Sequence, residues 1–495
     1  MFIIYTYVRY NRVKQYICSV IYGKSIYAPF IVECDIMISE LTNENMIEPI
    51  MEKVSRYDIK YVRLIVVDPL GSPRAMLVPE YALRETLEHG IAFDGSSIPG
   101  FAEVNKSDLH LHPDPTTFLV PMWETPGIAI MFSYVSNPDG TPFDGDPRGR
   151  LKKTVDELEE KGYGFNTGPE LEYFYVTNNG DTVKPFGAGG YFDAPPLDPT
   201  EDVKLETLMV LEDAGFQLDR VHHEVAMGQQ EINFRYSDAL KTADNVMLYK
   251  LAVKTIAQKH GTIATFMPKP FWGINGSGCH IHQSIIELET GLNIFVDDET
   301  DYGISDKALN YIAGTLEHAP AMSLVMAPLV NSYKRLVPHY EAPVYVSWGY
   351  ANRSALVRVP LAPGEKNKVT RIEYRHPDPS CNPYLAATLL LKAGWEGIEE
   401  KRRPMDPIAE NIYHFTPKDM KQLGVGTLPE HLGEAVDIFE EDSMMKDALG
   451  DYLYRNLIEL KRSEYNDYSS FTKVEWAASR PKITEWEYEK YLTRC

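Results

Sequence analysis

Residues 169–175 read Pro-Glu-Leu-Glu-Tyr-Phe-Tyr, so two acidic residues alternate with large apolar ones. On a β-strand, Glu170 and Glu172 point to one face while Leu171 and Tyr173 point to the other. Two carboxylates side by side repel each other, so burying them together requires a cation or a shared proton. A solvated strand face is the commoner reason for such a pair, and the pair alone does not decide between the two.

Three further groups of polar residues lie in β-rich sequence, at alternate positions or around a turn. They are Glu224 and Glu231, His280 and His282, and Arg371, Glu373 and Arg375. Sites made mostly of carboxylates, with one or two imidazoles, suit Mg²⁺ or Mn²⁺ better than zinc or copper. Each of these residues taken alone is more often structural, but four such groups in one part of the chain predict a site for hard divalent ions.

Arginines gather near the last of these groups. They are Arg335, Arg353, Arg358, Arg371 and Arg375. Mg²⁺ in proteins often accompanies a nucleotide, whose phosphates arginines bind. The sequence has no P-loop and no convincing glycine-rich fingerprint after a strand, so any nucleotide must be held by another device.

The surrounding elements indicate two parts of the chain. Strand and turn signals begin with residues 61–67 and 75–78 and end before the breaker cluster 137–142. Beyond that cluster, strands alternate with expected helices, which cover 201–214, 306–318, 383–399, 444–462 and a stretch capped by Asp238 that ends at Gly261. We predict a non-native or optional extension over 1–36, a small, mostly β domain over 37–140 and an α+β catalytic domain over 141–495.

Composition excludes several classes of protein. The net charge of −22 argues against a general nucleic-acid binder. Five cysteines without a CxxC pair argue against a disulfide framework or a structural zinc cluster and favour a reducing compartment. No apolar stretch reaches the ~20 residues of a membrane span, and the N-terminus lacks a clear signal peptide. We expect a cytoplasmic protein that binds neither nucleic acid nor a membrane.

Several motifs resemble those of glutamine synthetases, in the order in which that family has them. They are Asp94-Gly95-Ser96-Ser97, Pro169-Glu170-Leu171-Glu172, His222-His223-Glu224-Val225-Ala226, Lys269-Pro270-Phe271, Asn275-Gly276-Ser277-Gly278-Cys279-His280, Asn331-Ser332-Tyr333-Lys334-Arg335 and Ala351-Asn352-Arg353-Ser354. The chain most resembles the prokaryotic type I branch. The resemblance implies a ligase of nitrogen assimilation that forms L-glutamine from L-glutamate, ammonia and ATP through γ-glutamyl phosphate.

The resemblance also implies roles for matching positions. Two or more Mg²⁺ or Mn²⁺ ions would bind each subunit, one at Glu172, Glu224 and Glu231 and another at Glu170, His280 and Glu373. ATP would contact Tyr236, His282, Ser284, Arg353, Arg358 and Arg371. Glutamate and ammonium would contact Ser97, Tyr191, Asn275, Gly276, Arg335, Glu341 and Arg375. The implied catalytic residues are Asp94 in the ammonium pocket, Glu341 in a closing flap, and Arg353.

The implied fold is α+β. It combines a small β-grasp N-terminal domain with a large catalytic domain on a curved, funnel-like antiparallel sheet with flanking helices. The implied homo-oligomer is a dodecamer of two stacked hexameric rings, with active sites at subunit interfaces because Asp94 would reach a neighbouring subunit. Residues 483–488 resemble the segment that clasps the opposite ring, and a nitrogen-regulatory partner is a further expectation.

Two other functions stay open at this point. A relative that joins glutamate to a polyamine or another amine would keep the ATP and metal residues but alter the ammonium pocket. A catalytically dead relative would lose metal ligands, whereas all six expected positions are present. Regulation is open too: Glu103 stands where one subgroup has an arginine used in feedback, and the surroundings of Tyr413 do not match the subgroup that is adenylylated there.

Overall fold

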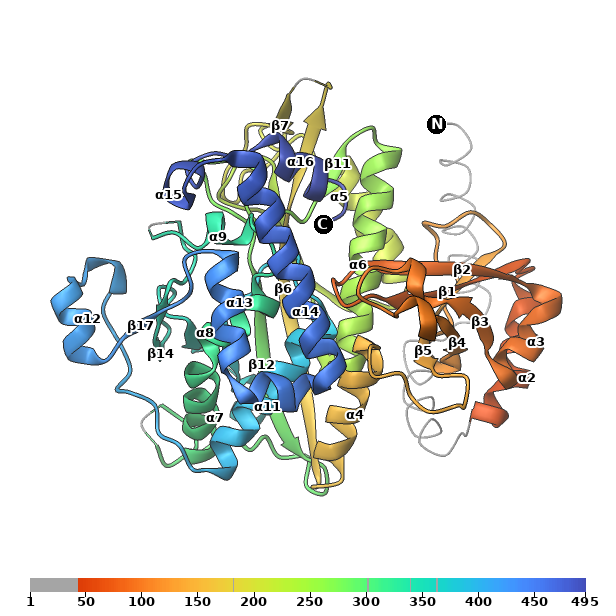
Figure 1. Ribbon diagram of the computed structural model, residues 1–495, viewed down its shortest axis with the longest axis horizontal. Helices are drawn as coiled ribbons and strands as arrows, with labels where there is room; N and C mark the ends of the chain where they lie inside the picture. Colours follow the sequence, from red (N-terminus) through yellow and green to blue (C-terminus); the bar gives the residue numbers. More distant parts are fainter. Residues whose placement is uncertain (1–42, 181, 301, 339, 362–363) are drawn as a thin grey trace, which may run out of the picture.

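The structure is a computed structural model that describes residues 43–495, except 181, 301, 339 and 362–363. The extension expected over residues 1–36 lies outside the described residues. A smaller sheet with two helices stands beside a larger sheet that carries most of the helices (Figure 1). This arrangement confirms the expected α+β class.

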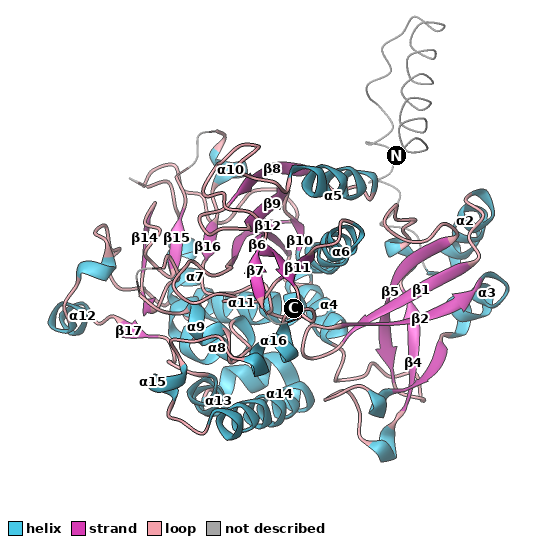
Figure 2. Cartoon of the chain, turned by 90° about the horizontal axis from the view of Figure 1, so that it is seen from above, coloured by secondary structure: helices cyan, strands magenta, loops and turns pink. Residues whose placement is uncertain are grey.

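The smaller sheet has five strands in the order β2-β1-β5-β4-β3. The bounds are β1 Tyr61–Val67, β2 Pro73–Pro79, β3 Ile91–Asp94, β4 Asp108–Pro113 and β5 Ile128–Ser136, and the helices beside the sheet are α2 Asn43–Arg56 and α3 Glu80–His89. Side chains alternate along β1, so Val62 and Leu64 pack in a core with α2 and α3, whereas Ile65 and Val67 join the core of the larger part. Figure 2 shows both helices against this sheet.

The larger sheet is built around the long strand β6 (Tyr163–Asn178), in the order β14-β15-β16-β12-β6-β9-β8. The other bounds are β8 Leu218–His223, β9 Gln229–Phe234, β12 Cys279–Glu287, β14 Trp348–Tyr350, β15 Val357–Val359 and β16 Ile372–Tyr374, and β7 (Val183–Pro185), β10 (Ser237–Asp238) and β11 (Ile263–Thr265) also pair with β6. The sheet is curved (Figure 2) and antiparallel, as expected, except that β14 and β15 run parallel.

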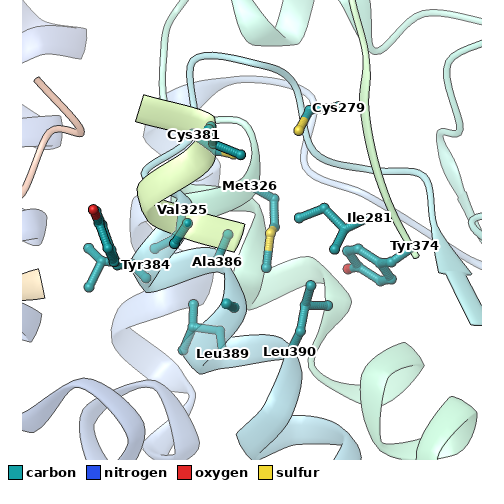
Figure 3. Packing of buried hydrophobic residues seen from close by; sticks show 14 of the residues in the cluster. Cys279, Ile281, Val325, Met326, Tyr374, Cys381, Tyr384, Ala386, Leu389 and Leu390 are labelled. Atoms are coloured by element: carbon teal, nitrogen blue, oxygen red, sulfur yellow. The ribbon is translucent and has the colours of Figure 1, made fainter. Parts of the chain in front are cut away.

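Helices cover one face of this sheet and leave the other to polar side chains. Cys279 and Ile281 on β12 are buried against helices α8 (Ala319–Met326) and α11 (Pro383–Glu399), as Figure 3 shows. Leu171 on β6 is buried in the same core. Because neighbouring residues of a strand point to opposite faces, Glu170 and Glu172 are directed away from this core.

The expected helices are present with small shifts. They are α5 Glu201–Asp213, α6 Ala239–Lys259, α7 Asp306–Glu317 and α11, and the side chain of Asp238 caps α6 by accepting from the amide of Lys241. The helix expected to end at 462 is longer: α14 spans Ser443–Thr472 and is interrupted at Gly450, where φ is 78°. It continues because buried Tyr468 extends the apolar face beyond the expected end.

The remaining elements connect these parts. They are α4 Pro147–Glu159, α9 Ser332–Arg335, α10 Lys366–Val369, α12 Pro417–Leu423, α13 Leu432–Glu441, α15 Trp476–Ser479, α16 Glu485–Tyr491, β13 Tyr345–Val346 and β17 Gly426–Thr427. Among the described residues, we find no helix with the length and apolar character that a membrane crossing needs.

Candidate active site

Strand register collects the polar residues on one face of the larger sheet. Glu170 on β6 lies opposite His280 on β12, while Glu172, two residues further, lies opposite Glu231 on β9. The carboxylates of Glu170 and Glu172 therefore share a face but have different cross-strand neighbours.

The same face continues outward in both directions. On one side, His282 on β12 lies opposite Glu373 on β16, which lies opposite Arg358 on β15. On the other side, His222 on β8 lies opposite Glu231. A cavity of about 490 Å³ lies over this face, and the side chains that border it include Glu170, Glu172, Tyr191, Glu224, Glu231, Asn275, His280, His282, Arg335, Glu341, Arg353, Arg358, Arg371 and Arg375.

The first cluster consists of Glu172, Glu224 and Glu231, with His222 between the last two. His222 Nδ1 lies 3.5 Å from Glu224 Oε1, and His222 Nε2 lies 3.7 Å from Glu231 Oε1. Burial and the charges of Glu224 and Glu231 raise the pKa of Glu172 well above its ordinary value. Burial and Glu231 likewise raise the pKa of Glu224 to about 7. Three carboxylates this close and this buried need positive charge beside them.

The second cluster consists of Glu170, His280, His282 and Glu373. His282 Nε2 lies 3.0 Å from Glu170 Oε1, and His280 Nδ1 lies 3.6 Å from Glu170 and 3.8 Å from Glu373. Burial opposes the charge of Glu170, but hydrogen bonds from His280 and His282 outweigh it and lower the pKa of Glu170. This carboxylate is thus ready to bind a cation in its ionised form.

Both clusters fit a divalent cation. Ligand atoms of Glu170, His282 and Glu373 lie within 4.8 Å of one another, and so do those of His222, Glu224 and Glu231. These groups differ from the expected sets, since His282 takes the place of His280 and His222 that of Glu172. His280 and Glu172 nevertheless border the same cavity. Carboxylate oxygens predominate among these donors, which suits Mg²⁺ or Mn²⁺.

Arginines pair with the second cluster. Glu373 is buried and accepts hydrogen bonds from Arg375 Nη1 at 2.5 Å and Arg358 Nη1 at 2.6 Å. Burial opposes the charge of Glu373, but Arg375 and the neighbouring histidines lower its pKa to about 2. Arg371 Nε donates to His282 Nδ1 at 3.2 Å, so His282 can donate to Glu170 through its other nitrogen.

Two loops close one side of the cavity. Asn275 Nδ2 donates to Glu341 Oε2 at 2.9 Å and thereby joins them. Glu341 is exposed and has a φ of 60°, which is uncommon for a residue other than glycine. Beneath these loops, buried Arg335 donates to the carbonyl of His376 at 2.8 Å. The structure therefore brings Asn275, Arg335 and Glu341 to the cavity.

Five expected site residues do not border this cavity: Asp94, Ser97, Tyr236, Ser284 and the buried Glu373. Ser284 pairs with Asn166 further along β12, on the same face as His282. Tyr236 lies over Gly168, where an added Cβ would come within 3.0 Å of the tyrosine Cβ. Asp94 and Ser97 lie in the smaller part, where Ser97 Oγ donates to exposed Asp94 at 2.9 Å.

Several cavity residues were not expected from the sequence. Arg220 Nη2 lies 3.3 Å from Glu170 Oε1, and Tyr340 also borders the cavity. Buried Gln229 donates through Nε2 to Glu172 Oε2 at 2.8 Å and to the carbonyl of Gly276 at 3.1 Å. Of the residues that were not expected, only His222 could have been found from the sequence. It stands two residues before Glu224, and this spacing places two strand side chains on one face.

Gln229 orients Glu172, so replacing it should weaken cation binding. We expect Gln229→Leu to reduce Mn²⁺ affinity about tenfold, since residues that orient a metal ligand typically contribute that much. A Mn²⁺ titration of the full chain measures this. Gln258→Leu, at the exposed end of α6, is the matched control. An unchanged affinity in Gln229→Leu would show that Glu172 needs no support from this amide.

Known proteins match almost the whole described chain. The profile described as "Glutamine synthetase, catalytic domain" matches residues 144–491, and the one described as "Glutamine synthetase, beta-Grasp domain" matches residues 58–138. A glutamine synthetase of Methanocaldococcus jannaschii is 43% identical over 91% of this chain and 98% of its own length. One from Pyrococcus abyssi is 45% identical over 88% of this chain and 96% of its own. A solved GmaS/ADP complex superposes with a TM-score of 0.78 at 31% identity, covering 89% of this chain and 98% of that one.

Proposed function

The chain belongs to the glutamine synthetase family, and on that premise we propose that it ligates ammonia to L-glutamate with ATP. The products are L-glutamine, ADP and phosphate, and γ-glutamyl phosphate is the intermediate. The observation that carries this proposal is the single sheet face on which two acidic clusters lie next to arginines over one cavity.

The reaction explains why this set of residues is needed. Ammonia cannot displace oxide from a carboxylate, so the side chain of glutamate must first receive a phosphoryl group. Transfer of that group concentrates negative charge on its oxygens, which fixed positive charges stabilise. Arg358, Arg371 and Arg375 border the cavity and would bind those oxygens, and exposed Arg353 borders the same cavity.

The acidic clusters would hold Mg²⁺ or Mn²⁺. Glu172, Glu224 and Glu231, beside His222, would hold one ion, and Glu170, Glu373 and the histidines would hold the other. When bound, such ions neutralise phosphate charge and polarise the reacting oxygens. The raised pKa values of Glu172 and Glu224 support this assignment, because a cation would relieve the repulsion between these carboxylates.

The two substrates would occupy opposite sides of the cavity. Asn275, Gly276, Arg335 and Arg375 would bind glutamate. ATP would lie toward His282, with Ser284 and Tyr236 further along the same sheet face. The similar fold of the GmaS/ADP complex supports a nucleotide on this scaffold.

Glu341 would belong to a flap that keeps γ-glutamyl phosphate from water. Removing its side chain deletes the hydrogen bond from Asn275 that joins the two loops. In Glu341→Ala we expect ATP cleavage to continue while glutamine formed per ATP cleaved falls to about half, because water enters a site that closes poorly. Measuring phosphate and glutamine in the same reaction gives this ratio. Glu410→Ala, an exposed change, is the control, and loss of ATP cleavage in Glu341→Ala would contradict the flap role.

We also propose that a neighbouring copy completes the ammonium pocket. Asp94 and Ser97 are exposed, and large apolar side chains of the same smaller part are exposed as well, including Val104 at 84% and Tyr81 at 90%. Tyr191 and Phe192 beside the cavity are exposed at 53% and 64%. Contacts between copies would cover such surfaces. A dodecamer in which the part 37–140 of one subunit meets the part 141–495 of the next would do so.

A direct assay tests the proposed reaction. The protein should form glutamine from glutamate, ammonium and ATP in the presence of Mg²⁺ or Mn²⁺. Absence of glutamine together with turnover of a larger amine would favour the amine ligase. The presence of Glu224 and Tyr191 at the cavity favours ammonium, since an anionic pocket both attracts the cation and offers a base.

A further inference from the structure

The last helix of the chain places a buried carboxylate behind the active site. Glu487 on α16, dark blue in Figure 1, is completely buried, and so is Lys334, whose Nζ donates to Glu487 Oε2 at 2.5 Å. Asn331 Nδ2 donates to the other oxygen, Oε1, at 2.7 Å. One carboxylate thus fixes two side chains of the segment that ends in Arg335.

Asn331 carries this connection to residues 269–276, which we call the glutamate loop because Asn275 and Gly276 in it would bind glutamate. Its amide oxygen accepts from the backbone N–H of Lys269 at 2.7 Å, and its nitrogen donates to the carbonyl of Lys269 at 2.9 Å. The ammonium of Lys269 in turn donates to the carbonyl of Ile274, directly before Asn275. The hydrogen bonds therefore connect Glu487 through Asn331 and Lys269 to Ile274, whose neighbour Asn275 contacts Glu341.

Two neighbouring contacts hold the same loops. Tyr488, next to Glu487, donates its hydroxyl to the carbonyl of Pro270 at 2.8 Å. Arg480 donates to the carbonyl of Leu336, the residue after Arg335, at 2.8 Å. The C-terminal segment thus fastens both backbone segments that supply glutamate contacts.

An ion pair is an expensive way to stabilise a core. Apolar side chains of similar volume at Lys334 and Glu487 would often be as stable or more so, because burying two charges loses their hydration. Directional hydrogen bonds, in contrast, define where Asn331 and Lys334 stand. Burial lowers the pKa of Lys334 even though Glu487 acts in the opposite direction, which agrees with this cost.

We propose that Glu487 is a positioning residue that sets the glutamate loop and Arg335 for glutamate binding. The proposal rests on the proposed function of the cavity. In Glu487→Gln, the side-chain amide has only one oxygen, which can accept from either Lys334 or Asn331. Its NH₂ group then faces the other donor, so the two donors can no longer both be satisfied. The two loops should then lose their common reference while the rest of the fold stays in place.

The experiment compares steady-state kinetics of the full chain and its variants. We expect the KM for glutamate to rise about tenfold in Glu487→Gln, with the KM for ATP changed less than about twofold. Glu489→Gln, exposed on the same helix, should behave as wild type. The double variant Lys334→Met/Glu487→Met removes the ion pair without leaving a lone buried charge. It also removes the hydrogen bonds from Lys334 to the carbonyl of Lys482 and from Thr484 to Glu487, so we expect a lowered Tm together with the raised KM for glutamate.

The outcomes distinguish the positioning role of Glu487 from the proposed function of the cavity. A Glu487→Gln protein with lowered Tm but an unchanged KM for glutamate, or a double variant with the wild-type KM, would overturn the positioning role. Failure of the wild-type protein to form glutamine would instead overturn the proposed function. A raised KM for glutamate in both variants, with the ATP parameters preserved, is the result that supports Glu487.

Discussion

Glu373→Gln should lower the rate of glutamine formation about a thousandfold, the scale of losing a key electrostatic contact in an active site. The change preserves shape but removes the charge that pairs with Arg375 and Arg358. It also removes a carboxylate from the group that includes Glu170 and His282. Because the pKa of Glu373 is about 2, the native side chain is ionised throughout the neutral range, and the whole charge is lost in the variant.

Steady-state assays at saturating Mg²⁺ measure this effect, and Glu289→Gln controls for it. Glu289 is exposed in the turn that follows β12, so its charge lies outside the cavity. A thermal unfolding curve shows whether Glu373→Gln is folded. A folded variant that retains more than about a tenth of wild-type activity would contradict a central electrostatic role for Glu373.

Much of the site could be predicted from local pattern. The alternation of Glu170 and Glu172 with apolar residues correctly predicted a strand with one polar face. The structure adds the reason why these two glutamates belong to different acidic clusters. Glu170 pairs with β12 and Glu172 pairs with β9, and these two strands lie on opposite sides of β6 in the sheet. That division depends on strand pairing, which no short stretch of sequence contains.

Other features depend on contacts between distant segments. His222 lies between Glu224 and Glu231, and Gln229 reaches Glu172, only because β8, β9 and β6 are neighbours. The hydrogen bonds of Glu487 join positions more than 150 residues apart. Residue type alone gives no sign of such contacts, because most glutamates on short helices are exposed.

Asp94→Asn should reduce kcat/KM for ammonium about a hundredfold and leave the KM for ATP nearly unchanged. Hydrogen bonds from Ser96 and Ser97 lower the pKa of Asp94, so its side chain is an exposed anion that can attract ammonium. Asparagine keeps an oxygen acceptor for these serines but has neither the charge nor the basicity. Asp108→Asn is a matched control, because Asp108 lies opposite Asp94 on β4 and is also exposed.

Mixing two inactive variants tests which subunit supplies Asp94. An Asp94→Asn chain keeps an intact cavity, and a Glu373→Gln chain keeps an intact Asp94. If each site joins the cavity of one chain to Asp94 of its neighbour, random co-assembly in equal amounts should restore about a quarter of the wild-type sites. If each chain used its own Asp94, every site would contain one defect, and co-assembly would restore none. Activity of the co-expressed mixture, compared with the two proteins assembled separately, therefore decides whether the site lies within one chain or between two.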